Sequence, residues 1–157
     1  MTEFKPKHSI SDAKKFQEGR EKIGGLILEG MKATGGTDID WVIEHRGGFI
    51  VLENKEFQND LISIPWGKMI AFEQLYKKLN SDGRCHFLIV GYDDIDFSDP
   101  KSIVWFFDME FWKMGTVRYT KSQKYKRYFI EREAMTPMSL NDFRYLIEKY
   151  WTDFENS

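Results

Sequence analysis

Two short apolar runs, residues 38–43 and 49–55, flank a pair of glycines in the first half of the chain. Glycine adopts positive φ without steric cost, so a glycine pair between such runs predicts a tight turn that joins two strands into a β-hairpin. Side chains alternate between the two faces of a strand. In the first run this alternation predicts a fully packed face that carries Ile39, Trp41 and Ile43.

Charged side chains share one face of each strand. Asp38 and Asp40 lie together on the first strand, and Glu53 and Lys55 lie together on the second. Pairing around the glycines places Asp40 across from Glu53 or close to it. Two carboxylates at the ends of apolar strands are costly unless something positive lies between them. Two carboxylates and an amine at a sheet edge can hold a magnesium ion and a water molecule beside a phosphate, which suggests a nuclease.

Periodicity and capping residues predict the elements around the hairpin. A helix is expected over 9–34, with Ser9 or Ser11 as its N-cap and Gly35-Gly36 at its end. A second helix is expected over 65–79, and residues 57–64 are the candidate for a third core strand. Further expected elements are a buried strand over 85–91, parallel to its neighbour, strands over 103–107 and 128–131, and an amphipathic helix over 139–154 capped by Ser139.

The order helix, hairpin, helix, strand, with Asp40 and then Glu53-Asn54-Lys55 closing the hairpin, resembles the PD-(D/E)XK nuclease superfamily. This superfamily includes restriction enzymes, Holliday-junction resolvases and phage or repair exonucleases, and the resemblance covers roughly the first half of the chain. It implies an α/β (α+β) fold with a restriction endonuclease-like core, a mixed β-sheet flanked by helices, and a C-terminal strand and helix extension. We therefore predict a single nuclease-like domain over 1–157, with its core at about 9–92 and a variable extension at about 93–157.

The resemblance also implies an activity, that of a magnesium-dependent deoxyribonuclease, an enzyme in which Mn²⁺ could replace Mg²⁺. Asp40 and Glu53 would be catalytic metal ligands, together with the backbone carbonyl of Asn54. Lys55 would orient the attacking water or help to deprotonate it. Asp38 is a candidate second-metal ligand or supporting acid. Some family members carry an extra acid in the first helix, for which the candidates are Glu21 and Glu29.

The chain departs from the family pattern at three positions. Ile39 replaces the proline that gives the family its name, and Asn54 stands where the middle residue of Glu-x-Lys is usually apolar. Many phage and repair members carry Gly-Gln at the start of the following helix, where this chain has Gly67-Lys68. Lys68 could contact the scissile phosphate or a neighbouring one.

Other candidate substrate contacts lie further along the chain. Gln74 is one of them, in the second predicted helix. Segment 119–128 gathers four basic residues among three tyrosines, and could grip phosphates and stack on splayed bases. It could equally be a solvated hairpin whose tyrosines pack inward. The basic residues are Lys121, Lys124, Lys126 and Arg127.

Composition limits the classes of function. A net charge of −2 argues against strong nonspecific binding to nucleic acid. The single Cys85 excludes an internal disulfide, and no zinc-site spacing is present. No run approaches a membrane span and no secretory signal is found, so we expect a cytoplasmic protein without a membrane partner. The aromatic-rich character would suit a phage or prophage protein.

Three functions are compatible with these patterns. The first is the metal-dependent nuclease acting on DNA, and cutting both strands of a duplex would favour a homodimer. The second is a catalytically weak nucleic-acid-binding module of the same fold, acting within a larger repair, restriction or phage replication complex. The third is a protein-interaction domain that uses the aromatic segment 105–112 as its contact surface.

Overall fold

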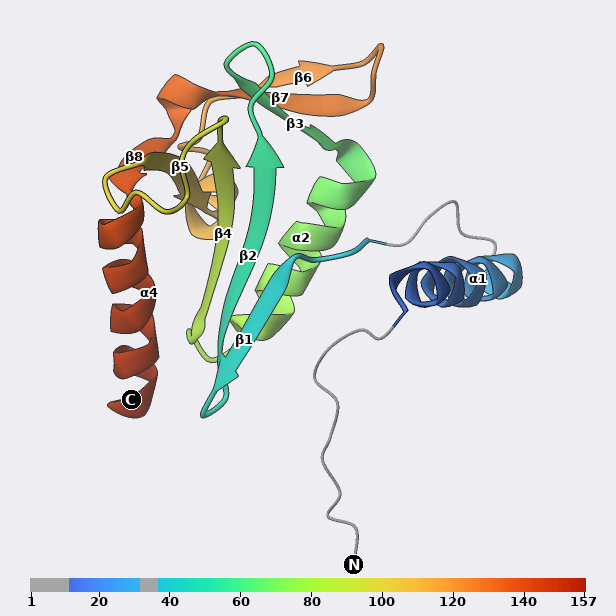
Figure 1. Cartoon of the computed structure of the whole chain (residues 1–157), viewed down its shortest axis with the longest axis horizontal. Coiled ribbons are helices and arrows are strands. Elements are labelled where there is room, and N and C mark those ends of the chain that lie inside the picture. The colour runs from blue at the N-terminus through green and yellow to red at the C-terminus, as the bar shows by residue number, and fades with distance from the viewer. Residues whose placement is uncertain (1–11, 32–36) are drawn as a thin grey trace, which may run out of the picture. The chain divides into compact units, whose positions relative to one another are not determined.

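The structure is a computed structural model that describes residues 12–31 and 37–157 (Figure 1). Its contacts divide the chain into two compact units, Met1–Asp38 and Ile39–Ser157. A single nuclease-like domain that includes both units stays a prediction. None of the helices in the described ranges combines the length and the apolar character needed to cross a lipid bilayer.

The first unit contains helix α1, Ala13–Met31. The side chain of Asp12 accepts a hydrogen bond from the backbone N–H of Lys15 at 3.0 Å, which satisfies one free donor at the helix start. The predicted caps at Ser9, Ser11 and Gly35-Gly36 lie outside the described residues. Phe16 and Ile23 are exposed, since no other element described for this unit covers them.

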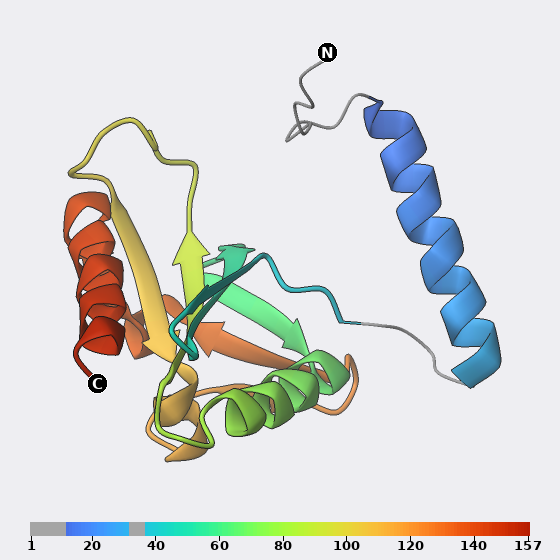
Figure 2. The ribbon, with the colours of Figure 1, turned by 90° about the horizontal axis from the view of Figure 1, so that it is seen from below.

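The second unit is built on a mixed five-stranded sheet with the order β1-β2-β4-β5-β8 (Figures 1 and 2). Strands β2 and β4 pair in parallel, as predicted, and the other neighbours pair antiparallel. The fold is therefore α+β, with a mixed sheet between helices. The strands are β1 (Trp41–His45), β2 (Gly48–Glu56), β4 (Cys85–Tyr92), β5 (Ile103–Asp108) and β8 (Thr136–Ser139).

The predicted hairpin is formed by β1 and β2. Arg46 and Gly47 both adopt positive φ, +50° and +81°, and His45 pairs with Gly48, so the turn has two residues of the type that matches strand twist. Gly48 was predicted to belong to the turn, but it does not have a positive φ and is the first residue of β2. A Cβ atom built on Gly48 would lie 2.5 Å from the ring of Phe154, so glycine allows a helix to approach the strand there.

The prediction that Trp41 lies on a packed face is wrong. Trp41 is 62% exposed and its neighbour Val42 is 52% exposed. Strand β1 is the edge strand of the sheet, and the helix on its side, α4 (Leu140–Glu155), packs at the turn end of the hairpin through a stack of His45 on Trp151. The end of β1 that carries Trp41 is therefore left uncovered.

Residues 57–64 do not add a strand to the main sheet. Strand β3 (Leu61–Pro65) instead pairs with β7 (Arg127–Glu131), which pairs with β6 (Thr120–Ser122) in a second sheet of three strands. Asn59 and Asp60 take positive φ, +52° and +61°, and turn the chain away from β2 before β3 begins. This local turn is why the predicted third core strand forms a separate layer.

Helices cover both faces of the main sheet. Along β4, Phe87 and Ile89 join one core cluster with Phe72 of helix α2 (Trp66–Leu79), whereas Leu88 and Val90 join another with α4. This alternation places α2 and α4 on opposite faces, as the two views show (Figures 1 and 2). Ser139 caps α4, as predicted, by accepting from the N–H of Asp142 at 3.1 Å. A short helix α3 (Met109–Lys113) and the 3-10 turn Arg132–Ala134 complete the fold.

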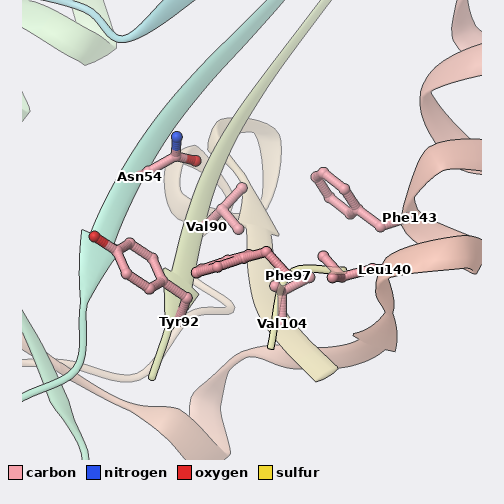
Figure 3. Close-up of a pocket in the computed structure, with 7 residues that line it drawn as sticks. All are labelled: Asn54, Val90, Tyr92, Phe97, Val104, Leu140 and Phe143. Atoms are coloured by element: carbon pink, nitrogen blue, oxygen red, sulfur yellow. The ribbon is translucent and has the colours of Figure 1, made fainter. Parts of the chain in front are cut away.

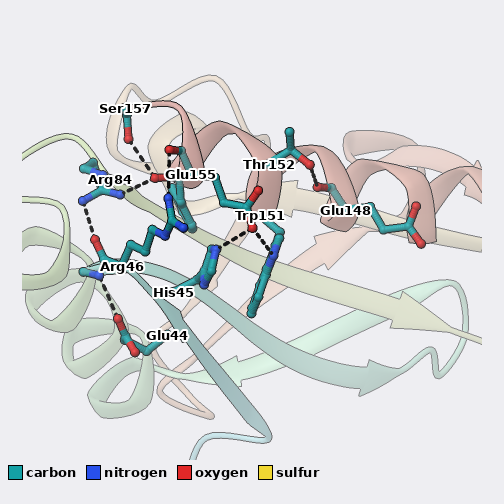
Figure 4. Close-up of polar contacts among 11 residues, drawn as sticks. Glu44, His45, Arg46, Arg84, Glu148, Trp151, Thr152, Glu155 and Ser157 are labelled. Carbon is teal, nitrogen blue, oxygen red and sulfur yellow. Dashed lines mark hydrogen bonds and ion pairs between the residues drawn. The ribbon is translucent and has the colours of Figure 1, made fainter.

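The C-terminal end of α4 is tied to the hairpin turn (Figure 4). Arg84 donates from Nη1 to the carbonyl of Arg46 at 2.7 Å, and from Nη2 to the carbonyl of Phe154 at 2.8 Å. The His45 and Trp151 rings stack with their centroids 3.6 Å apart. These contacts hold the hairpin against the helix at the end opposite to Asp40.

Candidate active site

The predicted carboxylates meet where the hairpin strands end. Trp41, the first residue of β1, pairs with Leu52, so Asp40 lies just before the strand and close to Glu53, as the sequence predicts. The strand predicted over 38–43 therefore begins three residues later than expected, and neither Asp38 nor Asp40 is part of it. The backbone N–H of Asp40 donates to Glu53 Oε2 at 3.3 Å, and the backbone N–H of Asn54 donates to Asp40 Oδ2 at 2.7 Å. Each carboxylate is thus anchored by the other strand. Glu53 is only 2% exposed, whereas Asp40 is exposed to solvent.

Two ammonium groups compensate the buried charge of Glu53. Lys68 Nζ lies 2.8 Å from Glu53 Oε1, and Lys55 Nζ lies 3.5 Å from the same oxygen. Lys55 follows Glu53 on the same face of β2, and Lys68 comes from the first turn of α2, which covers that face. A buried carboxylate without such partners would be strongly destabilising. The candidate active site therefore combines Asp40, Glu53, Lys55 and Lys68.

The surroundings of Lys55 shift its pKa. Burial lowers the pKa of Lys55 from its usual value, and the neighbouring charge of Lys68 lowers it further. The negative charge of Glu53 opposes both effects by raising the pKa of Lys55, but the net direction is downward. Lys55 is thus partly desolvated, unlike an ordinary surface lysine, which is strongly hydrated.

The oxygen atoms at this edge are of the kind that hard divalent cations prefer as ligands. In a strand the N–H and C=O of one residue point toward the same edge. The Asn54 N–H reaches Asp40, so the Asn54 carbonyl faces the same edge as the two carboxylates. Within residues 12–31 and 37–157 no group of three or more His, Cys, Asp and Glu side chains could hold a metal ion. Water or substrate would therefore supply the remaining ligands, as is usual for Mg²⁺.

The side chain of Asn54 points away from the carboxylates. It lines a cavity of about 350 Å³ on the α4 side of the sheet, together with Val90, Phe97 and Phe143 (Figure 3). This position explains why a polar residue is tolerated at Asn54, where the superfamily that the sequence resembles usually has an apolar one. The middle residue of Glu-x-Lys faces an open cavity in this fold, so a polar side chain is not buried in the core.

The predicted basic segment forms the β6–β7 hairpin, and its four basic residues face different surroundings. Lys121 Nζ lies 4.7 Å from the centre of the Trp66 ring, over the start of α2. Lys124 and Lys126 are exposed in the turn. Arg127 faces the outer side of the second sheet, where it donates from Nε to Ser63 Oγ and from Nη2 to the Ser63 carbonyl. Of the four, Arg127 lines a cavity together with Lys55 of the candidate active site.

The sequence left open whether the tyrosines of this segment pack inward or are free to stack on bases. Tyr119 and Tyr128 pack edge to face at 5.2 Å, and both contact Trp112. Tyr125 is 61% exposed at the turn. The hairpin is confirmed. Tyr128 packs inward, Tyr119 joins the same aromatic cluster but is 49% exposed, and Tyr125 is open to solvent.

Other predicted site residues lie elsewhere or in the first unit. Gln74 lies further along α2 and lines a small cavity with Lys113 of α3, away from Glu53. Asp38 lies 3.4 Å from Arg20 within the first unit. Glu21 accepts a hydrogen bond from Gln17 on α1. Glu29 belongs to α1, and its side chain lies outside the described set.

The sequence did not predict the ion pair of Lys68 with Glu53 or the hydrogen bonds that Arg127 donates to Ser63. For Ser63 a signal was present, because the alternation of Ile62, Ser63 and Ile64 puts the serine on the face opposite to the buried isoleucines. No comparable signal for Lys68 exists, since its contact depends on where α2 lies over the sheet. No known family model matches this sequence, and no curated protein is significantly similar to it.

Proposed function

We propose that this protein is a magnesium-dependent deoxyribonuclease that hydrolyses phosphodiester bonds. The observation that carries the proposal is the 2% exposed residue Glu53, whose carboxylate accepts from the backbone N–H of Asp40 and lies beside Lys55 at one sheet edge. Ordinary surface ion pairs do not bury a carboxylate in this way. Buried charged groups gathered at one edge are typical of functional sites. The choice of DNA over RNA rests on the resemblance to the nuclease superfamily.

Each residue of the site has a role in this proposal. Asp40, Glu53 and the Asn54 carbonyl would hold the cation, which would supply Lewis-acid stabilisation of the charge that develops on the phosphate. Lys55 holds the attacking water by a hydrogen bond and places it in line with the phosphorus. The water oxygen forms a bond to phosphorus as the bond from phosphorus to the 3′ oxygen breaks. The proton of the water goes to solvent, and the leaving oxygen takes a proton from solvent.

A specific observation favours a second function, the catalytically weak nucleic-acid-binding module. Lys68 Nζ lies 2.8 Å from Glu53 Oε1, so an ammonium group already neutralises one of the two candidate metal ligands. The ammonium group of Lys68 would then compete with Mg²⁺ for the Glu53 carboxylate. Replacing Lys68 by glutamine, the residue at this place in many members of the superfamily that the sequence resembles, would then strengthen the binding of Mg²⁺.

The experiment is cleavage of labelled single-stranded, duplex and branched DNA in Mg²⁺, Mn²⁺ or Ca²⁺. Wild-type protein is compared with Glu53→Gln, which keeps the shape of the side chain but loses its charge. Glu148→Gln is the matched control, because this exposed glutamate lies on α4 on the opposite side of the sheet. Cleavage in Mg²⁺ or Mn²⁺ should fall at least about 100-fold in Glu53→Gln and stay unchanged in Glu148→Gln.

Two results would decide against the deoxyribonuclease. Folded wild-type protein that cuts none of the DNA forms would favour the binding module. Cleavage that survives in Glu53→Gln would place the reaction elsewhere. Thermal unfolding in rising Mg²⁺ provides the independent readout, because a site that binds the ion raises Tm with concentration. A rise in wild type that is larger in Lys68→Gln would identify the lysine as a competitor for the metal position.

A further inference from the structure

A cavity of about 370 Å³ lies beside the candidate active site, between the end of β2 and the outer face of the second sheet. Lys55 forms one side of it and Arg127 forms another, although 72 residues separate them in the sequence. Its volume is at the lower end of the range for small-molecule pockets. A single nucleotide unit is the scale of ligand that it suits, and a duplex is not.

The charge lining this cavity is suited to an anion. Arg127 is half-buried, and in the described part of the chain no carboxylate forms an ion pair with it. Its partner is the neutral Ser63, which accepts from Nε and Nη2 and so fixes the plane of the guanidinium. Glu56 also lines the cavity, but its side chain is exposed. An oriented cation without a counter-charge is a ready binding group for a phosphate.

The remaining walls suit a base. Phe129 lines the cavity next to Arg127 and is held edge to face by Tyr125, with the ring centres 6.4 Å apart. Aromatic rings of this kind stack on unpaired bases. Gln58 and Asn59 also line the cavity, and their amide groups can donate to and accept from base edges.

We propose that this cavity binds one nucleotide of an unpaired DNA strand, next to the phosphate that is cut. Its phosphate lies between Arg127 and Lys55, and its base stacks on Phe129. The substrate is therefore a single strand or an unpaired end, since a base inside a duplex cannot enter. The inference rests on the proposed function for the nature of the ligand, but its test measures binding without metal.

The test measures, by fluorescence anisotropy, how tightly a labelled single-stranded DNA of ten nucleotides binds to the full chain in EDTA. Arg127→Gln should weaken binding at least tenfold and reduce the salt slope of log K by about 0.7, the value for one phosphate contact to a single strand. Arg118→Gln is the matched control, because Arg118 is exposed and does not line the cavity. The control should weaken binding less than about threefold.

A second variant separates the base from the phosphate. Phe129→Leu should weaken binding of the ten-nucleotide DNA about tenfold and leave binding of an abasic strand of the same length unchanged. Circular dichroism and Tm establish that each variant is folded. If Arg127→Gln does not fold, Phe129→Leu carries the test alone. Free inorganic phosphate should compete only weakly, since it has no base.

Three results would overturn the inference. If Arg127→Gln and Arg118→Gln weaken DNA binding equally, the DNA is held by diffuse electrostatic attraction and not by this cavity. A blunt duplex that binds as tightly as the unpaired strand would exclude a one-nucleotide cavity, and Phe129→Leu with unchanged binding would exclude stacking. Failure of the proposed function is distinguishable from these results. If the wild-type protein binds through Arg127 but never cuts DNA in Mg²⁺, only the proposed nuclease function is contradicted. If the wild-type protein cuts DNA but Arg127→Gln and Phe129→Leu leave the affinity for DNA unchanged, only the proposed nucleotide site is contradicted.

Discussion

Glu53 is the residue on which the local electrostatics of the site depend. Its carboxylate accepts one backbone N–H and lies within 3.5 Å of two ammonium groups, from Lys55 and Lys68. Lys68 is 19% exposed and Glu53 is 3% exposed at the side chain, so water screens this pair only partly. The contact between them should therefore contribute more than an exposed ion pair does.

A double-mutant cycle tests this at the residue scale. Glu53→Gln, Lys68→Met and the double variant are compared by urea unfolding, and we expect a coupling free energy of about 1–3 kcal/mol. Lys149 and Asp153 on α4 are the control pair, at a similar distance of 3.0 Å but 69% and 54% exposed. Their coupling should stay below about 0.5 kcal/mol. Equal coupling in the two pairs would mean that burial does not strengthen the contact between Glu53 and Lys68.

The contact between the hairpin and α4 belongs to the scale of elements. Arg84 links the hairpin turn to the last turn of α4 through two carbonyls, those of Arg46 and Phe154. Phe154 then packs directly on the backbone of Gly48. The helix thus buttresses the hairpin strand whose far end carries Glu53.

Gly48→Ala tests this packing. The added Cβ would lie 2.5 Å from the ring of Phe154, so the helix or the strand has to move, and we expect a loss of about 1–3 kcal/mol in the free energy of unfolding. Gly67→Ala is the matched control, since a Cβ there meets nothing within 4 Å and the residue lies in helix α2. That change should be neutral or stabilising by about 0.5–1 kcal/mol. A neutral Gly48→Ala would mean that α4 does not press on the hairpin.

Alkaline stability is a property of the whole molecule. Burial raises the pKa of Cys85, Tyr76 and Tyr150, each to about 12, and the negative charge of Asp108 is the next cause in all three. Asp108 is itself only 6% exposed, and the three groups come from β4, α2 and α4. One buried carboxylate therefore influences titration on both sides of the main sheet.

The sign of the pH dependence follows from these shifts. Between the unfolded values of 9.0 for cysteine or 10.0 for tyrosine and the folded values near 12, the folded chain holds protons that the unfolded chain has lost. The free energy of unfolding should therefore fall as pH rises from about 9 to 12. Tyr150→Phe should make this fall shallower, and Tyr145→Phe, at an exposed position, should not.

Urea unfolding at several pH values measures this change, and alkylation of the thiol gives a separate check. Cys85 in the folded protein should react with iodoacetamide at pH 9 far more slowly than in urea, because both burial and its raised pKa suppress the thiolate. Equal rates would show that the thiol is accessible and that burial is not the cause of its raised pKa.

Local pattern was enough to predict the hairpin, helices α2 and α4, strand β4 and one half of the site. A two-residue turn and the alternation of side chains place Asp40 close to Glu53, with Lys55 on the same face, because these relations depend on the fixed geometry of a hairpin. The parallel pairing of β4 and the Ser139 cap followed from equally local rules. Such rules act over a few residues and do not depend on the rest of the chain.

Tertiary structure decided the other half. Lys68 meets Glu53 only because α2 lies over that face of the sheet. Arg127 lines the same cavity as Lys55 only because β3 pairs with β7 in a second sheet. The exposure of Trp41 likewise depends on where α4 ends. The packing of layers is set by the sum of many apolar contacts from distant segments, so no short pattern records it. The sequence by itself therefore determined which residues share a strand face, and the packing of the layers determined which faces meet.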